Sequence, residues 1–244
     1  MFCWYELRTT DVSAAQRFYA AVMQWETRDP PGPGLFWQAD RAVADVSPLS
    51  LQARQNGAPA HWLGHLGTGD LDRTMGNLIG AGALLRGPVR TGQDGSLAVL
   101  RDPHGAMVGL STDRTKQSQA VSWHELHVLD AEKALALYCE QFGWQPQEVI
   151  DLPMGIGPYR MFASQAGKTP CGAVASMAHR PQVHTHWLFY FAVDDLDAAC
   201  ARVVAQGGEV FFGPVEAFGG RRIAVCHDPQ GAEFALQASA PIPC

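Results

Sequence analysis

Apolar and polar positions follow two different periods along this chain. Short runs such as CWYELRT at 3–9 alternate with a period of two, which is typical of a half-buried strand. The segment after Asp11 instead spaces its apolar residues for one face of a helix, and Asp70, Asp130 and Asp195 each precede a similar segment. The pattern predicts helices near 12–23, 71–81, 131–142 and 196–206, separated by strands and by turns rich in Gly and Asp-Pro.

The same order of elements occurs twice. WYEL at 4–7 returns as WHEL at 123–126, HWLGHL at 61–66 as HWLFYF at 186–191, and DPHG at 102–105 as DPQG at 228–231. An internal repeat of about 120 residues is long enough for two domains. We predict domains at 1–113 and 121–244, joined by a polar linker at 114–120. Each half holds two strand–Asp–helix–strand units, which makes four in the chain.

Composition narrows the class of protein. The chain has 244 residues, 47% of them apolar, and a net charge of -6, which argues against a nucleic-acid partner. No signal peptide or membrane-spanning run is found in the sequence, so we expect no membrane association. The six cysteines lack paired spacing, which predicts free thiols and a cytoplasmic protein. A monomer, in which the repeat forms an internal pseudo-dimer, and a homodimer both fit the sequence.

The strand–Asp–helix units, the F-Y and G-W pairs and the D-P-x-G strands resemble the vicinal oxygen chelate superfamily, which includes glyoxalase I, extradiol dioxygenases and bleomycin resistance proteins. The doubled W-x-E-L opening resembles its tandem two-domain glyoxalase-like members. The resemblance implies an α+β fold of four βαβββ modules, which pair into two curved eight-stranded mixed sheets, each around a cleft. Modules could pair in chain order, or first with fourth and second with third.

The resemblance also implies where a divalent metal would be bound. In the family, His, Gln and Glu side chains hold it. The six matching positions here are Trp4, Leu63 and Gly109 in the first half and Trp123, Leu188 and Ala235 in the second. Indole, isobutyl and methyl groups offer no lone pair to a metal. We therefore predict no metal at the standard position and no cofactor.

Other side chains on the same strand faces form the predicted ligand site. Because residues two apart in a strand share a face, Trp4, Glu6 and Arg8 point together. The complete predicted site comprises Trp4, Glu6, Arg8, His65, Trp123, Glu125, His127 and Tyr190. The tryptophans would form flat walls and the glutamates polar anchors. The alternatives are that the glutamates hold backbone amides or Arg8, and that the tryptophans only fill the core.

A displaced metal site is a further hypothesis for the second half. Glu233 lies two residues before Ala235 and so shares its strand face. Histidines also gather in the strands expected to line that cleft: His124, His127, His184 and His186. The first half has Met107 at the position of Glu233, so only the second half offers such a site.

Three functions of different classes follow. The first, which we favour, is a metal-free protein that binds a small molecule in aromatic clefts. The second is an enzyme, either a lyase or dioxygenase with a displaced metal or an acid–base catalyst that uses Glu6 or Glu125. The third is a protein-interaction module whose clefts are filled with side chains. The sequence does not decide whether the protein is an enzyme.

Overall fold

The computed structural model describes residues 1–28, 34–152 and 157–238. Five helices are present in these ranges: α1 (Val12–Met23), α2 (Leu51–Gln55), α3 (Leu71–Gly80), α4 (Ala131–Phe142) and α5 (Leu196–Ala205). None of the described helices is long and apolar enough to cross a bilayer. The four predicted helices are confirmed, whereas α2 was not predicted. The five cysteines at described positions are free thiols, and Cys244 lies outside the described residues.

The first half forms one mixed sheet. Its strand order is β2-β3-β4-β1-β5-β9-β8-β6, and β7 pairs with β8. The strands are β1 (Phe2–Thr9), β2 (Glu26–Thr27), β3 (Gly34–Gln38), β4 (Arg41–Pro48), β5 (His61–Gly67), β6 (Leu84–Leu85), β7 (Arg90–Gly92), β8 (Gly95–Arg101) and β9 (Met107–Ser111). β1 and β4 are parallel, as are β5 and β9, whereas β2 with β3, β3 with β4, and β8 with β6, β7 and β9 are antiparallel.

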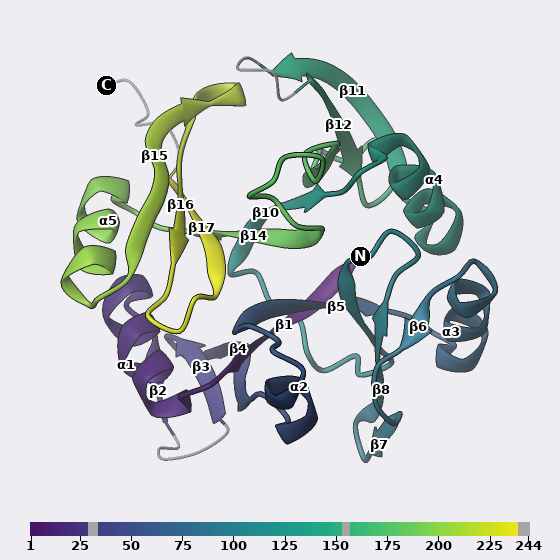
Figure 1. Cartoon of the computed structure of the whole chain (residues 1–244), viewed down its shortest axis with the longest axis horizontal. Helices are drawn as coiled ribbons and strands as arrows, with labels where there is room; N and C mark the ends of the chain where they lie inside the picture. Colours follow the sequence, from purple (N-terminus) through teal and green to yellow (C-terminus); the bar gives the residue numbers. More distant parts are fainter. Residues whose placement is uncertain (29–33, 153–156, 239–244) are drawn as a thin grey trace. The chain divides into compact units, whose positions relative to one another are not determined.

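The second half repeats this topology in an eight-stranded sheet. Its order is β11-β12-β13-β10-β14-β17-β16-β15. The strands are β10 (Val121–His127), β11 (Gln145–Leu152), β12 (Gly157–Ala163), β13 (Gly172–Ala175), β14 (His186–Ala192), β15 (Glu209–Ala217), β16 (Arg221–His227) and β17 (Glu233–Ala238). The α+β fold of four βαβββ modules in two mixed sheets is confirmed, and within each sheet the modules follow chain order (Figure 1).

Contacts divide the chain differently from the sheets. One compact unit contains residues 1–4, 63–117 and 123–188, and the other contains the described parts of 5–62, 118–122 and 189–244. Each unit therefore combines one module from each half. In the second unit α1 and α5 lie side by side (Figure 1). There the Arg202 guanidinium donates to the carbonyl oxygen of Val22 at 3.0 and 3.2 Å.

The predicted aspartate caps begin the four long helices. The carboxylates of Asp11, Asp70, Asp130 and Asp195 each accept a hydrogen bond from a first-turn backbone amide. Such a bond satisfies one of the amides that a helix leaves without an internal partner.

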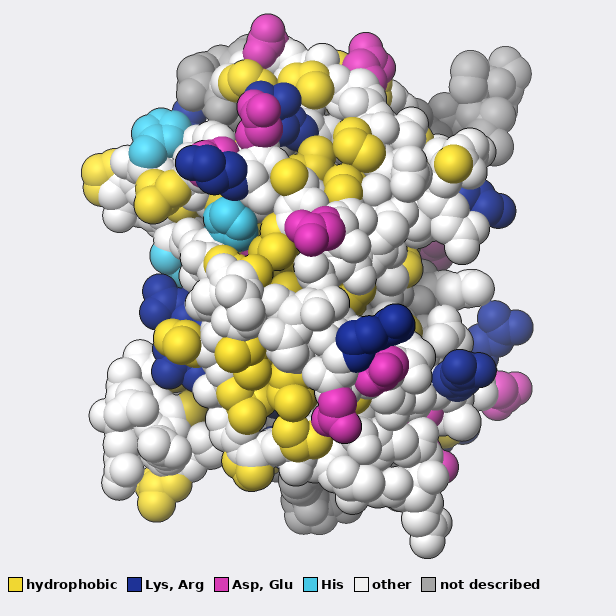
Figure 2. All heavy atoms as spheres, turned by 90° about the vertical axis from the view of Figure 1, so that its right-hand side faces the viewer, with side chains coloured by type: hydrophobic (Ala, Val, Ile, Leu, Met, Phe, Trp, Pro, Cys, Tyr) yellow, Lys and Arg dark blue, Asp and Glu magenta, His cyan; other side chains and the backbone are white. Residues whose placement is uncertain are grey.

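In the first unit, α3 and α4 lie on the side shown in Figure 2, where acidic and basic side chains are interspersed with small apolar groups.

An aromatic core and a hydrogen-bonded triad hold each unit together. In one unit Trp62 Nε1–H donates to the Tyr19 hydroxyl at 2.9 Å, and this hydroxyl donates to Asp228 Oδ2 at 3.2 Å. The other unit contains the equivalent triad: Trp187 to Tyr138 at 3.2 Å and Tyr138 to Asp102 at 2.8 Å. Trp62 and Trp187 are thus core residues. In both triads the tyrosine and the aspartate come from different halves of the chain.

Candidate functional site

The second W-x-E strand carries a buried polar network. Glu125 and His127 are both on β10, and His127 Nε2 lies 2.6 Å from Glu125 Oε1. The other carboxylate oxygen accepts a hydrogen bond from the Tyr159 hydroxyl at 2.8 Å, and this hydroxyl accepts one from Trp123 Nε1–H, also at 2.8 Å. All four side chains are buried. The predicted period of two thus brings Trp123, Glu125 and His127 into one network, with Tyr159 as a member that the sequence did not indicate.

Tyr159 reaches Glu125 across an intervening strand. On β13, Ala175 pairs in register with His127 on one side and with Tyr159 on the other, and Ala173 pairs with Glu125. Both alanines are fully buried. Because successive residues of a strand point to opposite faces, the methyl groups at 173 and 175 share the face of Glu125 and His127. Their small size leaves room for the tyrosine ring.

The first W-x-E strand builds a different network. Arg8 donates to Glu6 Oε2 at 3.0 Å, and Ser47 Oγ donates to Glu6 Oε1 at 2.6 Å. Ser47 pairs in register with Arg8 and so stands where Ala175 stands in the second half. The guanidinium and the hydroxyl thus satisfy both oxygens of the buried carboxylate. Glu6 thus makes the contact with Arg8 that the structural alternative named.

In the first half, the positions that the family resemblance assigns to metal ligands carry other groups. The imidazole of His65 lies over Gly109, and a Cβ built on this glycine would be 2.8 Å from His65 Cγ. The ring therefore fills the space in which a glutamate at 109 would have to begin. Trp4 is buried, and the ammonium of Lys116 lies 5.1 Å from its ring centroid. Together with Leu63, these residues do not fit the metal that the fold family implies.

In the second half the corresponding positions offer no better set of ligands. The indole N–H of Trp123 is a donor and is already used by Tyr159. The side chains of Leu188 and Ala235 have no atom that can bind a metal. Tyr190 is buried on β14 and pairs in register with Ala235, in the compact unit that does not include Glu125. The place of Tyr190 and of His65 in the ligand site stays a prediction.

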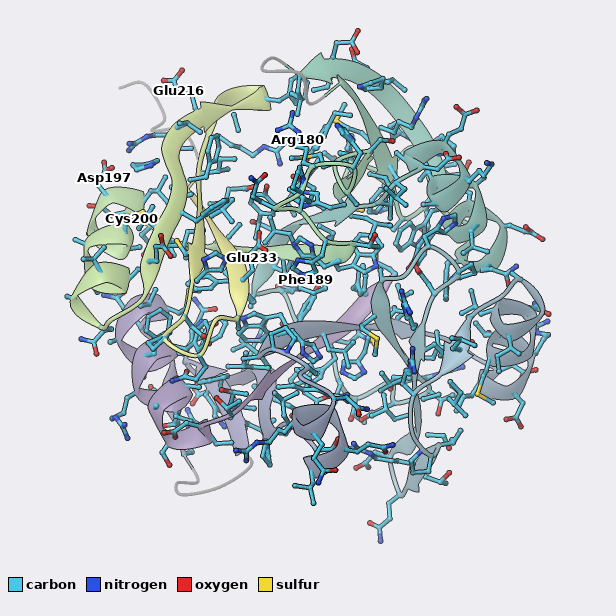
Figure 3. All side chains as sticks on the ribbon, viewed as in Figure 1. Arg180, Phe189, Asp197, Cys200, Glu216 and Glu233 are labelled. Carbon is cyan, nitrogen blue, oxygen red and sulfur yellow. The ribbon has the colours of Figure 1, made fainter. Side chains whose placement is uncertain are left out.

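The displaced metal site finds no support as a cluster. Among the described residues, no three His, Cys, Asp or Glu side chains are grouped as metal ligands. Glu233 lies on β17, which pairs with the strand that carries Phe189 (Figure 3). His184 and His186 stack on each other at 4.5 Å, and the His186 ring packs edge-on against His127 at 4.9 Å.

The placement of His124 with the cleft histidines was wrong. As the neighbour of Glu125 in a strand, it points to the opposite face. Its ring stacks on Phe2 at 4.9 Å, and Nδ1 lies 2.9 Å from the carbonyl oxygen of Cys171. Complete burial lowers the pKa of this imidazole from 6.5 to about 4. His124 is therefore a neutral core residue at physiological pH.

The two D-P-x-G aspartates have a role beyond their turns. Asp102 Oδ1 accepts from the backbone amides of residues 104 and 106, and Asp228 Oδ1 accepts from those of 230 and 232, as expected of turn residues. Their second oxygens accept from Tyr138 and Tyr19. Burial raises the pKa of both carboxyl groups. In the sequence, Tyr19 and Tyr138 are 119 residues apart, which is also the offset between the two W-x-E-L segments. This repeat indicated that the two tyrosines are equivalent, but it did not identify their hydrogen-bond partners.

Comparison with known proteins agrees with this architecture. The model of the "Glyoxalase-like domain" matches residues 4–110, and that of the "Glyoxalase/Bleomycin resistance protein/Dioxygenase superfamily" matches residues 120–236. "Putative glyoxylase CFP32" of Mycobacterium tuberculosis is 32% identical over 98% of this chain and 94% of its own length. "Anthracycline biosynthesis protein DnrV" of Streptomyces peucetius is 27% identical over 96% of this chain and 91% of its own.

Solved structures show the same fold at low sequence identity. The 2,3-dioxygenase LapB from Pseudomonas sp. KL28 has a TM-score of 0.66 at 14% identity, covering all of this chain and 93% of its own. The Mn(II)-bound glyoxalase from Novosphingobium aromaticivorans has a TM-score of 0.68 at 13% identity, with 98% of this chain and 82% of its own covered. From its two domain matches and its full-length relative, the chain belongs to the glyoxalase/bleomycin resistance protein/dioxygenase superfamily.

Proposed function

We propose that this chain binds a small organic molecule at the second W-x-E strand, without the family's standard metal. The observation that carries the proposal is the buried network of Glu125, His127 and Tyr159. Among the described residues, His127 Nδ1 has no hydrogen-bond partner. A buried polar atom without a partner costs about 1–3 kcal/mol, so such atoms are rare unless a ligand or water meets them.

The two halves have different roles in this proposal. In the first half, Glu6 is held by Arg8 and Ser47, and the His65 ring lies over Gly109. These contacts support a structural role for the first half's polar residues, as in the interaction-module hypothesis. The second half keeps a carboxylate, an imidazole and a phenol together. It is therefore the half to which we assign the ligand.

The ligand class follows from the relatives and from the side chains present. One relative is named for anthracycline biosynthesis, and anthracyclines are polycyclic aromatic molecules with phenolic hydroxyl groups. The tryptophan, tyrosine and histidine rings around Glu125 suit a flat aromatic ligand. We therefore infer a planar, hydroxylated aromatic ligand. The free cysteines support a reducing compartment such as the cytoplasm.

Alizarin, a hydroxylated anthraquinone dye, tests this function. Equilibrium dialysis should show binding of one dye molecule per chain, and Glu125→Gln should weaken it about tenfold because the carboxylate that holds His127 and Tyr159 in place is lost. Glu6→Gln, the same substitution in the other half, is the matched control and should bind as the wild type does.

Metal analysis of the same sample separates the competing hypothesis. Absence of dye binding would refute the proposed function. Stoichiometric transition metal that survives dialysis and is lost in Glu233→Ala would instead establish the displaced metal site.

A further inference from the structure

The protonation pattern of His127 is set by its partner. A neutral imidazole has one N–H and one lone pair, and the hydrogen bond of one nitrogen decides which is which. Here Nε2 lies 2.6 Å from the Glu125 carboxylate, so Nε2 carries the hydrogen and Nδ1 the lone pair. Nδ1 is the atom that has no partner among the described residues. The arrangement leaves Nδ1 as a buried nitrogen with a lone pair.

A carboxylate and two further imidazole rings lie close to His127. Glu125 contacts it directly, and the Tyr159 hydroxyl fixes the other carboxylate oxygen at 2.8 Å. His186 packs edge-on against the ring at 4.9 Å and is stacked on His184. Glu125 can therefore hold the imidazolium that forms when Nδ1 accepts a proton.

The first half provides the contrast. Its equivalent of His127 is Arg8, whose guanidinium always carries its proton and offers no lone pair. Its hydroxyl comes from Ser47 on the adjacent strand instead of from a tyrosine two strands away. The same W-x-E frame thus supplies a base in one half only.

We propose that His127 Nδ1 is a proton acceptor that ionises a phenolic hydroxyl of the bound molecule. The inference rests on the proposed function. In the step, the phenolic O–H bond breaks and an Nδ1–H bond forms. The electron pair of the O–H bond stays on oxygen as phenolate, and Nε2–H remains hydrogen-bonded to Glu125. Net charge is conserved, and no oxidant or other reactant takes part. Tyr159 is a positioning residue, because it acts on Glu125.

The colour change of alizarin on ionisation provides the test. The dye is titrated with pH, free and in the presence of saturating wild-type protein, and its apparent pKa is read from absorbance. We expect the bound dye to ionise about one to three pH units lower than the free dye, as an adjacent base that becomes cationic predicts. Binding measured by dialysis in the same samples ensures that the dye is in the site.

Three variants assign the effect to the proposed atoms. His127→Gln should abolish the pKa shift of the bound dye. Glu125→Gln, which preserves shape and guards against misfolding of the first variant, should reduce the shift by at least about one pH unit. Tyr159→Phe should reduce it partly, a change that a purely structural tyrosine would not produce. Glu6→Gln should leave the shift at the wild-type value.

Two results would overturn the inference while leaving the proposed function intact. One is a wild-type protein that binds the dye but leaves its apparent pKa at the free value. The other is a His127→Gln variant that binds the dye and keeps the full shift. Failure of the dye to bind at all counts against the proposed function itself, and the dialysis measurement reports this separately.

Discussion

Tyr19→Phe should destabilise the protein although it removes a single oxygen atom. The Tyr19 hydroxyl is the centre of a buried triad, accepting from Trp62 Nε1–H at 2.9 Å and donating to Asp228 Oδ2 at 3.2 Å. Tyr19 is fully buried, so water does not replace the lost group without disturbing the core. The variant leaves one donor and one acceptor without this partner.

The cost can be worked out from these two groups. Each buried group that loses its hydrogen-bond partner costs about 1–3 kcal/mol, so the free energy of unfolding should fall by about 2–6 kcal/mol for the two groups together. For a protein of this length that corresponds to a Tm roughly 5–20 °C lower. Tyr138→Phe, which breaks the equivalent triad with Asp102 and Trp187, should have a similar effect.

The effect should also depend on pH. Burial raises the pKa of Asp228, whereas the hydrogen bond from Tyr19 lowers it. A carboxyl group whose pKa is higher in the folded than in the unfolded state stabilises the fold at low pH, and this contribution is lost as pH rises through the folded pKa. Without Tyr19 the pKa of Asp228 rises further. The variant should therefore lose more stability at pH 8 than at pH 5.

Urea denaturation of wild type, Tyr19→Phe, Asp228→Asn and the double variant at both pH values measures this coupling. The two single changes should be non-additive, because they break the same hydrogen bond. A Tyr19→Phe variant within about 0.5 kcal/mol of wild type at pH 8, or fully additive changes, would refute the role given to the triad.

Two further predictions concern packing and acid stability. Gly109→Ala should lower the free energy of unfolding by about 1–3 kcal/mol, because its methyl group would overlap the buried His65 ring. Gly76→Ala is the control, because no atom lies within 4 Å of the added Cβ and because alanine is about 1 kcal/mol more favourable than glycine in a helix. Equal Tm values for the two variants would contradict this account. His124, with its pKa lowered from 6.5 to about 4, stays neutral in the fold while the unfolded chain takes up a proton. The free energy of unfolding should fall by about 2–3 kcal/mol between pH 7 and 4.5, and His124→Gln should remove this pH dependence in urea denaturation. An unchanged pH dependence in the variant would count against the role of His124.

The elements that the sequence predicted are those with strong local signals. The four long helices each combine an aspartate cap with a periodic apolar face, and both features are local. Helix α2 was not predicted because it is short and has no buried residue, so its sequence shows no periodic apolar face. The order of strands in the sheets came from the family resemblance, since hydrogen-bonded neighbours such as β1 and β4 are distant in the chain.

The sequence predicted the contact within one strand of the candidate site but not the contact between strands. Period two placed Glu125 beside His127, which the structure confirms. Tyr159 could not be found this way, because its contact depends on strand register and on two alanines of the strand between. His124 was grouped with His127 although the two residues are three positions apart in β10. An odd separation in a strand puts two side chains on opposite faces. Local periodicity fixes the face of a residue, whereas its partner depends on the tertiary fold.

The duplication itself separates structural from chemical residues in this chain. A residue that the fold requires should appear in both copies, and the Trp–Tyr–Asp triad does, with matching partners at Trp62 and Trp187. A residue that serves one ligand needs to appear only once. The partners of the two glutamates differ in this way: arginine and serine in the first copy, histidine and tyrosine in the second. Both copies therefore support the fold, and the asymmetry around the glutamates is the reason why we propose the ligand site in the second copy.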